Sequence, residues 1–400
     1  MLKPADLFKS PNAIAKYYSH FKVSERLLLT GHSHQAWPDC GFEGQKQAWI
    51  DAAEYVDDKW EKAFRKAEEV RNGYRRLLED DNGFIALSSN THELIIRFLS
   101  ALPINRDVNI VTTDGEFHTI RRQLDRLSEE GIEIIKVSSS PADEVVEKII
   151  SKINSKTIAV LVSKVFFNSG EILNDLYGLA EHCEKTGTKL LVDVYHALNV
   201  IPFSIKKEKL QNAFIVGGGY KYCQLGEGNC FLRFPRDTGL RPVITGWYSE
   251  FGTLSGVKQK GEVNYGAGDA LFAGATYDPT SNYRAAEVFN FFNNQRFTPS
   301  LLREVSLHQI SLLADEFDKY DYNTDIIKRN RTVNIKKLGG FLVLYSPFAQ
   351  KICAELKKEG VWTDYRGDRL RLGPAPYLSD EQLITSMSIL NNVLKKFNSL

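Results

Sequence analysis

Short apolar runs recur along the first part of the chain and alternate with amphipathic stretches. The runs are rich in β-branched residues, which is typical of strands buried on both faces of a sheet. Because helical periodicity lies between several of them, the sequence predicts an α/β fold, with a mostly parallel sheet covered by helices on both faces. We predict strands at residues 84–89, 108–113, 132–137, 157–163, 189–194, 213–217 and 229–234.

The pattern changes after about residue 285. A long amphipathic helix is expected there at 300–320, followed by a strand at 339–346 and a helix that Gly360 closes. Such a succession is typical of a smaller α+β domain. We therefore divide the chain into an N-terminal segment that packs with the small domain (1–30), a large domain that contains the sheet (31–284) and a small C-terminal domain (285–400).

The composition narrows the class of protein. Of the 400 residues 43% are hydrophobic, and 51 basic against 50 acidic side chains leave a formal charge of +1. Because the charges are scattered, we expect neither nucleic acid nor a membrane as a partner. The N-terminus lacks a signal-peptide core, and no stretch approaches the ~20 apolar residues of a membrane helix, so a cytoplasmic location is expected. The five cysteines form no CxxC pair, which argues against a disulfide framework and a metal site.

The most informative stretch surrounds the predicted strands at 189–194 and 213–217. Asp193 lies at the carboxyl end of one strand, His196 follows three residues later, and Lys221 comes after a glycine run that ends the next strand. Taken singly, Asp193 would be a helix cap and Lys221 an exposed lysine. Together they share one edge of a parallel sheet. There a desolvated amine can form a Schiff base, and a carboxylate can hold a pyridine nitrogen protonated.

The pattern DxxH followed by YKY, at Asp193, His196 and residues 220–222, resembles that of the class V aminotransferase family. These are fold type I pyridoxal phosphate (PLP) enzymes, and the similarity is greatest to kynureninases, with support from the segment FNSGEILND. The resemblance implies that Asp193 contacts the pyridine nitrogen and that His196 lies beside the ring. It also implies that Lys221 carries the cofactor as an imine and that the Tyr220 hydroxyl reaches the phosphate.

The resemblance assigns further cofactor contacts. In ALSSNTHELIIRFL the phosphate-binding turn falls at Asn90 and Thr91, where a hydroxyl and the amides of a helix N-terminus would hold a dianion. A plain N-cap would give the same local pattern, and position in the chain favours the phosphate role. Phe117 takes the place of the ring that stacks on the cofactor, with a core phenylalanine as the alternative. His118 is expected to be only a neighbour.

Two assignments concern a partner subunit. Trp247, in ITGWYSEF, resembles the kynureninase tryptophan that reaches the phosphate in the partner, which implies a homodimer with shared active sites. A core or interface tryptophan is the alternative. In LFAGATYDP a second polar residue of the family crosses the interface; it is Thr276 or Asp278, depending on where the count starts, and we assign Thr276.

The segment TDYRGDRLRLGPAPY resembles the family segment that binds the substrate α-carboxylate, and it assigns this role to Arg371. A guanidinium suits a carboxylate because it can donate two parallel hydrogen bonds. Arg366 and Arg369 are the alternatives within the segment, and we expect them to be solvated or structural.

The sequence departs from kynureninases where those enzymes recognise the side chain of their substrate. The histidine and asparagine that contact an aryl ketone are not clearly present. The family's GNSLG segment is GHSHQ here, so Ser33 is retained and assigned to substrate binding, whereas His32 and His34 are new. The cysteine of the related desulfurases is also missing before Arg371, since Cys353 falls earlier, within a predicted helix.

We therefore predict a PLP-dependent enzyme that acts on an amino acid by transamination or related chemistry at Cα or Cβ. Hydrolytic cleavage of a γ-keto amino acid, as in kynureninase, is the first alternative. A PLP-binding protein without catalysis is the second. Lys221 and Asp193 are the expected catalytic residues, and no metal is expected. The sequence does not identify the substrate.

Overall fold

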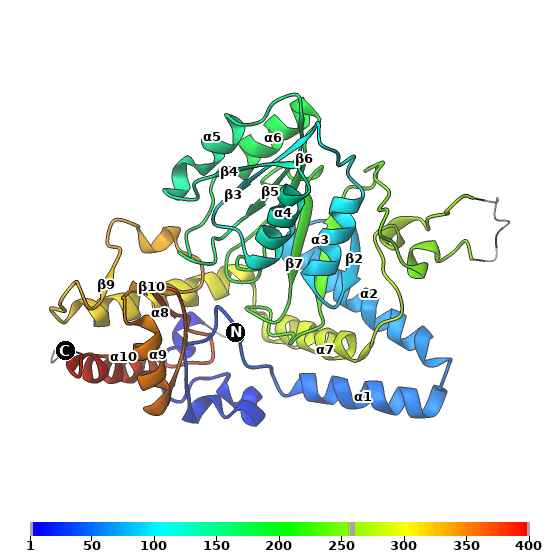
Figure 1. Ribbon diagram of the computed structural model, residues 1–400. Coiled ribbons are helices and arrows are strands. Elements are labelled where there is room, and N and C mark those ends of the chain that lie inside the picture. Colours follow the sequence, from blue (N-terminus) through cyan, green and yellow to red (C-terminus); the bar gives the residue numbers. More distant parts are fainter. Residues whose placement is uncertain (1–2, 255, 257–260, 398–400) are drawn as a thin grey trace.

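A computed structural model describes residues 3–254, 256 and 261–397. Within these residues the largest sheet has seven strands in the order β2-β8-β7-β6-β5-β3-β4 (Figure 1). The strands from β4 to β7 pair in parallel, whereas β8 runs antiparallel to both β7 and β2. They are β2 (Phe84–Ser88), β3 (Asn109–Thr113), β4 (Glu133–Val137), β5 (Thr157–Ser163), β6 (Lys189–Asp193), β7 (Phe214–Gly218) and β8 (Cys230–Phe234).

The large sheet is buried on both faces because neighbouring side chains of its strands enter different hydrophobic clusters. Ile110 and Leu191 pack in a cluster with α3 and α4, whereas Val111 and Val192 pack in a cluster with α2, α5, α6 and α7. The predicted strands and the predicted α/β fold are therefore confirmed. The helices are α1 (Cys40–Tyr55), α2 (Lys59–Leu78), α3 (Thr91–Ser100), α4 (His118–Glu129), α5 (Val145–Ile150), α6 (Leu176–Thr186) and α7 (Thr280–Gln295).

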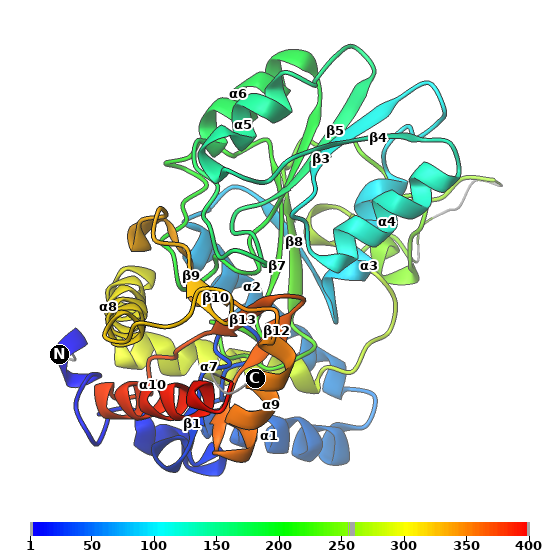
Figure 2. The ribbon, with the colours of Figure 1, turned by 60° about the vertical axis from the view of Figure 1, so that its left-hand side comes forward.

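The C-terminal part is built around a smaller antiparallel sheet, which in the described ranges has the strand order β12-β13-β10-β9. Helices α8 and α10 pack against each other beside it (Figure 2). No helix of the described chain has the length and apolar character needed to cross a membrane. The elements are α8 (Pro299–Asp318), β9 (Lys328–Arg329), β10 (Leu342–Tyr345), α9 (Ala349–Lys358), β12 (Asp364–Arg366), β13 (Arg369–Leu372) and α10 (Asp380–Lys395).

The start of the chain lies against this C-terminal part (Figure 2). Strand β1 (Leu27–Leu28) pairs in parallel with β11 (Val361–Trp362). The backbone N–H of Asp380 donates to the carbonyl of Phe8 at 2.9 Å. The opening segment therefore contacts the C-terminal part through backbone hydrogen bonds.

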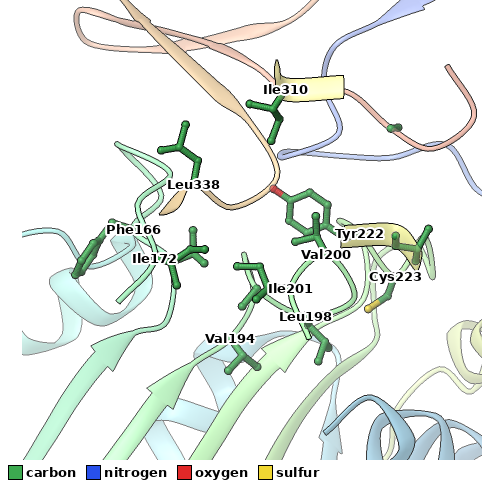
Figure 3. Close-up of a cluster of buried hydrophobic side chains, with 14 of the residues drawn as sticks. Phe166, Ile172, Val194, Leu198, Val200, Ile201, Tyr222, Cys223, Ile310 and Leu338 are labelled. Atoms are coloured by element: carbon green, nitrogen blue, oxygen red, sulfur yellow. The ribbon is translucent and has the colours of Figure 1, made fainter. Parts of the chain in front are cut away.

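A buried cluster joins the ends of the central strands to the C-terminal part (Figure 3). Val194 follows β6 and Tyr222 follows β7, and they share this core with Ile310 of α8 and with Leu338. Close packing allows such side chains little displacement. The loops after β6 and β7, which carry the predicted chemistry, are therefore held from both parts of the molecule.

One buried ion pair fixes the antiparallel strand β8 near its carboxyl end, at Arg233. Arg233 is 1% exposed, and its Nε donates to Oδ2 of Asp80 at 2.6 Å. Its Nη1 donates to the carbonyls of Gln211 and Ala213 at 2.7 and 3.0 Å. The guanidinium thereby ties β8 to the end of α2 and to the start of β7.

We expect Asp80→Ala to destabilise the protein by roughly 3 kcal/mol, because the Arg233 charge would stay buried without its partner. The free energy of unfolding, measured by urea titration, would test this. Asp81→Ala is the matched control, since Asp81 is exposed next to it. A loss below about 0.5 kcal/mol for Asp80→Ala would contradict the structural role of the pair.

Candidate active site

The carboxyl ends of β5, β6 and β7 and the start of α3 surround a cavity of about 330 Å³. Its size suits a small ligand, and its place is the one where parallel sheets bind ligands. The predicted site residues that line it are Asn90, Thr91, Phe117, Asp193, His196, Tyr220 and Lys221. Those that do not line it are Ser33, Trp247, Thr276 and Arg371.

Lys221 follows β7 and is 5% exposed. Its Nζ hydrogen-bonds with Nε2 of His196 at 2.7 Å. Burial disfavours the ammonium form and lowers the pKa of Lys221 to about 7, against the opposing effect of the Asp193 carboxylate. A substantial fraction of the amine is therefore unprotonated and nucleophilic at neutral pH.

Aromatic rings surround this amine. Nζ of Lys221 lies 4.6 Å from the ring centroid of Tyr195, 5.4 Å from that of Phe117 and 5.6 Å from that of Tyr220. Phe117 packs edge-on against Phe167, with the centroids 5.3 Å apart. Burial raises the pKa of Tyr220 to about 12, so its hydroxyl keeps its proton and can donate a hydrogen bond. Such walls suit a flat, conjugated ligand.

Asp193 ends β6 and contributes a carboxyl group to the lining of the cavity. Its Oδ1 accepts the backbone N–H of Tyr195 at 2.8 Å. Burial raises the pKa of Asp193, although the Tyr195 N–H and the charge of Lys221 act in the opposite direction. A protonated ring nitrogen in the cavity would favour the ionised carboxylate, because opposite charges attract strongly where water is excluded.

His196 lies between these two groups in the sequence and contacts the lysine. Burial, together with the nearby charge of Lys221, holds the pKa of His196 well below its usual value. The imidazole is therefore neutral at pH 7 and adds no charge to the cavity. Its Nδ1 is buried and has no hydrogen-bond partner among the described residues.

The start of α3 forms the wall opposite the strand ends. Oδ1 of Asn90 accepts the backbone N–H of Glu93 at 2.9 Å, so this side chain caps the helix. The cap weighed from the sequence is thus present, and Ser89 and Thr91, which carry hydroxyl groups, line the cavity. A helix N-terminus with hydroxyl groups beside it favours an anion.

Glu116 is a buried acid that sequence reasoning missed. It is 2% exposed, and its carboxyl accepts Oγ of Ser163 at 2.6 Å and Oγ1 of Thr113 at 2.7 Å. Burial raises the pKa of Glu116 to about 7, and the charge of Asp193 adds to this effect. Ser163 pairs with Asp193 across β5 and β6. An acid three residues after the end of the strand predicted at 108–113 was the available signal, masked by the more familiar phenylalanine that follows.

Arg371 lies in β13, behind the cavity wall, and is 3% exposed. Its Nε and Nη2 donate to the two carboxylate oxygens of Asp364 at 2.9 and 2.5 Å. Its Nη1 donates to the carbonyl of Phe167 at 2.9 Å. Oδ1 of Asp364 also forms a hydrogen bond with Nε2 of His32 at 2.7 Å. Asp364 was not among the predicted residues, although it lies in the same segment.

Comparison with curated proteins finds relatives over most of the chain. A kynureninase of Bacillus cereus (strain ATCC 10987) is 24% identical over 331 residues, which cover 77% of this chain and 72% of that protein. An uncharacterized aminotransferase, YcbU of Bacillus subtilis (strain 168), is 22% identical over 339 residues, 84% and 86% of the two chains. No family model matches the sequence.

Solved structures share the fold. A cysteine desulfurase from Thermococcus onnurineus NA1 superposes with a TM-score of 0.80 at 16% identity, over 96% of this chain and 98% of that one. A C-DES mutant with glycine covalently linked to its PLP cofactor gives a TM-score of 0.81 at 14% identity, over 94% and 98% of the chains. In sequence the chain is thus similar to a kynureninase and to an aminotransferase, and in fold to cysteine desulfurases. The resemblance predicted from its motifs is confirmed, and so is the fold type I architecture.

The segment between β8 and α7 projects from the molecule (Figure 1), and Trp247 and Thr276 lie in this part of the sequence. Nε1 of Trp247 donates to Oγ1 of Thr276 at 3.2 Å. Trp247 is 49% exposed. Asp278, the alternative to Thr276, accepts a hydrogen bond from the backbone N–H of Thr280, the first residue of α7, at 2.9 Å. Thr276 borders a second hollow of about 1360 Å³, and Ser89, Glu227 and Gly228 line both this hollow and the cavity.

The early histidine segment lies close to the cavity without lining it. The ring of His34 stacks on Tyr220, with centroids 4.7 Å apart and an interplanar angle of 19°. Oγ of Ser33 lies 3.1 Å from Nδ1 of His34. Ser33 thus supports the ring that covers Tyr220.

Cys353 lies in α9, where its Sγ contacts the carbonyl of Thr363 at 3.5 Å. Burial raises the pKa of this thiol, which leaves it a poor nucleophile. In the described part of the chain, no three His, Cys, Asp or Glu side chains are grouped to hold a metal ion.

We predict that the Lys221 amine reacts with a small aldehyde with a pH midpoint near 7, because the ammonium form below the pKa is not nucleophilic. Asp193→Asn should move this midpoint lower, since the carboxylate stabilises the ammonium form. Reductive methylation with formaldehyde across about pH 5 to 10, followed by peptide mass spectrometry, measures it. Asp315→Asn, an exposed change on α8, is the control. A midpoint unmoved by Asp193→Asn would contradict the coupling.

Proposed function

We propose that this chain is a PLP-dependent enzyme that acts on an amino acid by transamination or related chemistry at Cα or Cβ. The observation that carries the proposal is a buried lysine amine with a pKa lowered to about 7, in one cavity with the Asp193 carboxylate and the start of α3. The kynureninase and aminotransferase relatives, and the C-DES protein with its PLP cofactor, support it.

The residues present fit PLP group by group. Lys221 offers an amine to the aldehyde, Asp193 a carboxylate to the pyridine nitrogen, and Phe117 a ring face to the heterocycle. Thr91 and the α3 N-terminus, capped by Asn90, offer donors to the phosphate. Further roles belong to the proposal: Tyr220 as a phosphate donor, His196 beside the ring, and Trp247 and Thr276 at the phosphate of a partner subunit.

When bound, PLP withdraws electrons from the Cα of an amino acid joined to it. Asp193 supports this by holding a proton on the ring nitrogen. Lys221, once free, is the base for the Cα proton, because its amine is unprotonated near neutral pH. His196 keeps Nζ of Lys221 in place through the 2.7 Å contact. Arg371 and Ser33 are the proposed substrate contacts, with Arg371 receiving the α-carboxylate.

Two alternatives differ in outcome. Hydrolytic cleavage of a γ-keto amino acid is favoured by the kynureninase relatives, but the histidine and asparagine for an aryl ketone are not recognisable in the chain. A PLP-binding protein without catalysis would not require Arg371 in addition to Lys221 and Asp193. We therefore place transamination and related chemistry first.

The assembly and location belong to the proposal as well. We propose a homodimer, since Val243, Ile244 and Trp247 expose apolar side chains on the projecting segment. We propose the division at residues 30 and 284, with PLP held by the large domain. A cytoplasmic location is supported by the five cysteines, all described and all free thiols.

Purified protein supplied with PLP should be yellow, and borohydride should fix the cofactor to Lys221. Lys221→Ala should abolish the covalent attachment, whereas Lys164→Ala, a change at another buried lysine, should retain it. Mass spectrometry of the reduced protein measures both. Cofactor still fixed to the Lys221→Ala chain would overturn the proposal.

A spectral screen with kynurenine, 3-hydroxykynurenine, alanine and cysteine separates the reactions. Conversion of an added 2-oxo acid without release of ammonia indicates transamination, whereas alanine formed from kynurenine indicates hydrolysis. A yellow protein that responds to no amino acid indicates the binding role.

The shared-site dimer can be tested by mixing subunits. Lys221→Ala and Trp247→Ala chains should each form defective sites, and their mixed dimer should recover one intact site of two. Borohydride-fixed cofactor per chain measures this. If a proven mixed dimer recovers no cofactor attachment, Trp247 contributes to the active site of its own subunit or to no active site.

A further inference from the structure

Asp364 takes up the part of Arg371 that a substrate carboxylate needs. A guanidinium has five N–H donors, and its side-on pair is the fork that binds carboxylates bidentately. In Arg371 both atoms of this fork, Nε and Nη2, are bonded to Asp364. The carbonyl of Phe167 engages Nη1. Only two of the five donors are left for any other carboxylate.

A second carboxylate cannot simply join this pair. Arg371 is 3% exposed, so two carboxylates on it would repel each other in a region of low dielectric constant. One guanidinium charge would then face two negative charges, which is an expensive arrangement away from water. An arriving α-carboxylate must therefore displace Asp364 from at least part of the fork.

The displaced Asp364 carboxylate has other partners close by. His32 donates to its Oδ1 through Nε2 at 2.7 Å, and Nη1 of Arg366 lies 3.6 Å from its Oδ2. The Asp364 side chain is 20% exposed, in contrast to the 4% of Arg371. Arg366 is 45% exposed, so it can follow a rotated carboxylate toward solvent. The displaced group would thus keep two partners.

We infer that Asp364 is a specificity-determining residue that competes with the substrate α-carboxylate for Arg371. When an amine without a carboxylate is bound, Asp364 stays hydrogen-bonded to Arg371 and neutralises its charge. When an α-amino acid is bound, the substrate carboxylate replaces Asp364 on Arg371. The inference rests on the proposed function, in which Arg371 receives that carboxylate. It adds that affinity for α-carboxylates is set by the cost of moving Asp364 toward His32 and Arg366.

Glycine and methylamine are suitable probes, because they carry the same amine and differ in the carboxylate. Each is titrated into the PLP-loaded protein, and the change in absorption gives a dissociation constant. We expect Asp364→Asn to lower the dissociation constant of glycine about tenfold and to change that of methylamine by less than about twofold. The reason is that one charge-assisted hydrogen bond is worth at least a tenfold factor in affinity. Asp368→Asn is the control: Asp368 lies in the same hairpin and pairs with Arg369 instead.

Arg366→Gln gives an independent test if Asp364→Asn does not fold. The change is at an exposed position and removes one partner of the displaced Asp364 carboxylate. Glycine should therefore bind several-fold more weakly, while the affinity for methylamine is unchanged. Equal or weaker glycine binding by Asp364→Asn would overturn the inference and make Asp364 a residue that positions Arg371. Unchanged glycine binding by Arg366→Gln would also overturn it.

Failure of this inference is distinguishable from failure of the proposed function. A wild-type protein that never becomes yellow with PLP, or whose absorption ignores both probes, contradicts the proposed function. A yellow wild-type protein that responds to methylamine and glycine, with variants that keep the same glycine to methylamine ratio, contradicts only the role of Asp364.

Discussion

The removal of one lysine amine from water is the constraint on which the site depends. Solvent would keep Lys221 protonated at pH 7, whereas the burial of its side chain lowers its pKa to about 7 and leaves a substantial fraction of the amine unprotonated. That burial comes from three rings on neighbouring loops, and two of these rings, Tyr195 and Tyr220, pack in the cluster with α3 and α4. Tyr222, directly after Lys221, packs in the other cluster together with Ile310 of α8, so both parts of the molecule hold the loop that carries the amine.

The charged side chains of the site form two hydrogen-bonded groups. The amine of Lys221, the carboxyl of Asp193 and the neutral His196 form one group, and Arg371 with Asp364 forms another. Phe167 contacts both regions, since it lines the cavity and its carbonyl accepts a hydrogen bond from Arg371. A ligand with one amine and one carboxylate would connect the two groups, which suits an α-amino acid.

Much of this could be predicted from the sequence. Strands buried on both faces leave continuous apolar runs, so the seven central strands were visible, and Asp193 and Lys221 followed from the strand ends. Side-chain partners were not visible. Nothing in the spacing of Asp364 and Arg371 shows that they pair, because they meet only when β12 and β13 fold as a hairpin. Glu116 was missed for a related reason, since its partner Ser163 comes from another strand.

Strand β8 has a consequence for the timing of ligand binding. Because it returns antiparallel beside β7, the loop that carries Lys221 begins and ends on adjacent strands, and Gly219 donates its N–H to the carbonyl of Asn229 at 2.8 Å across its neck. A loop clamped in this way loses its conformational freedom during folding. The amine is thus in position before any aldehyde arrives, and the encounter need not wait for the chain to rearrange.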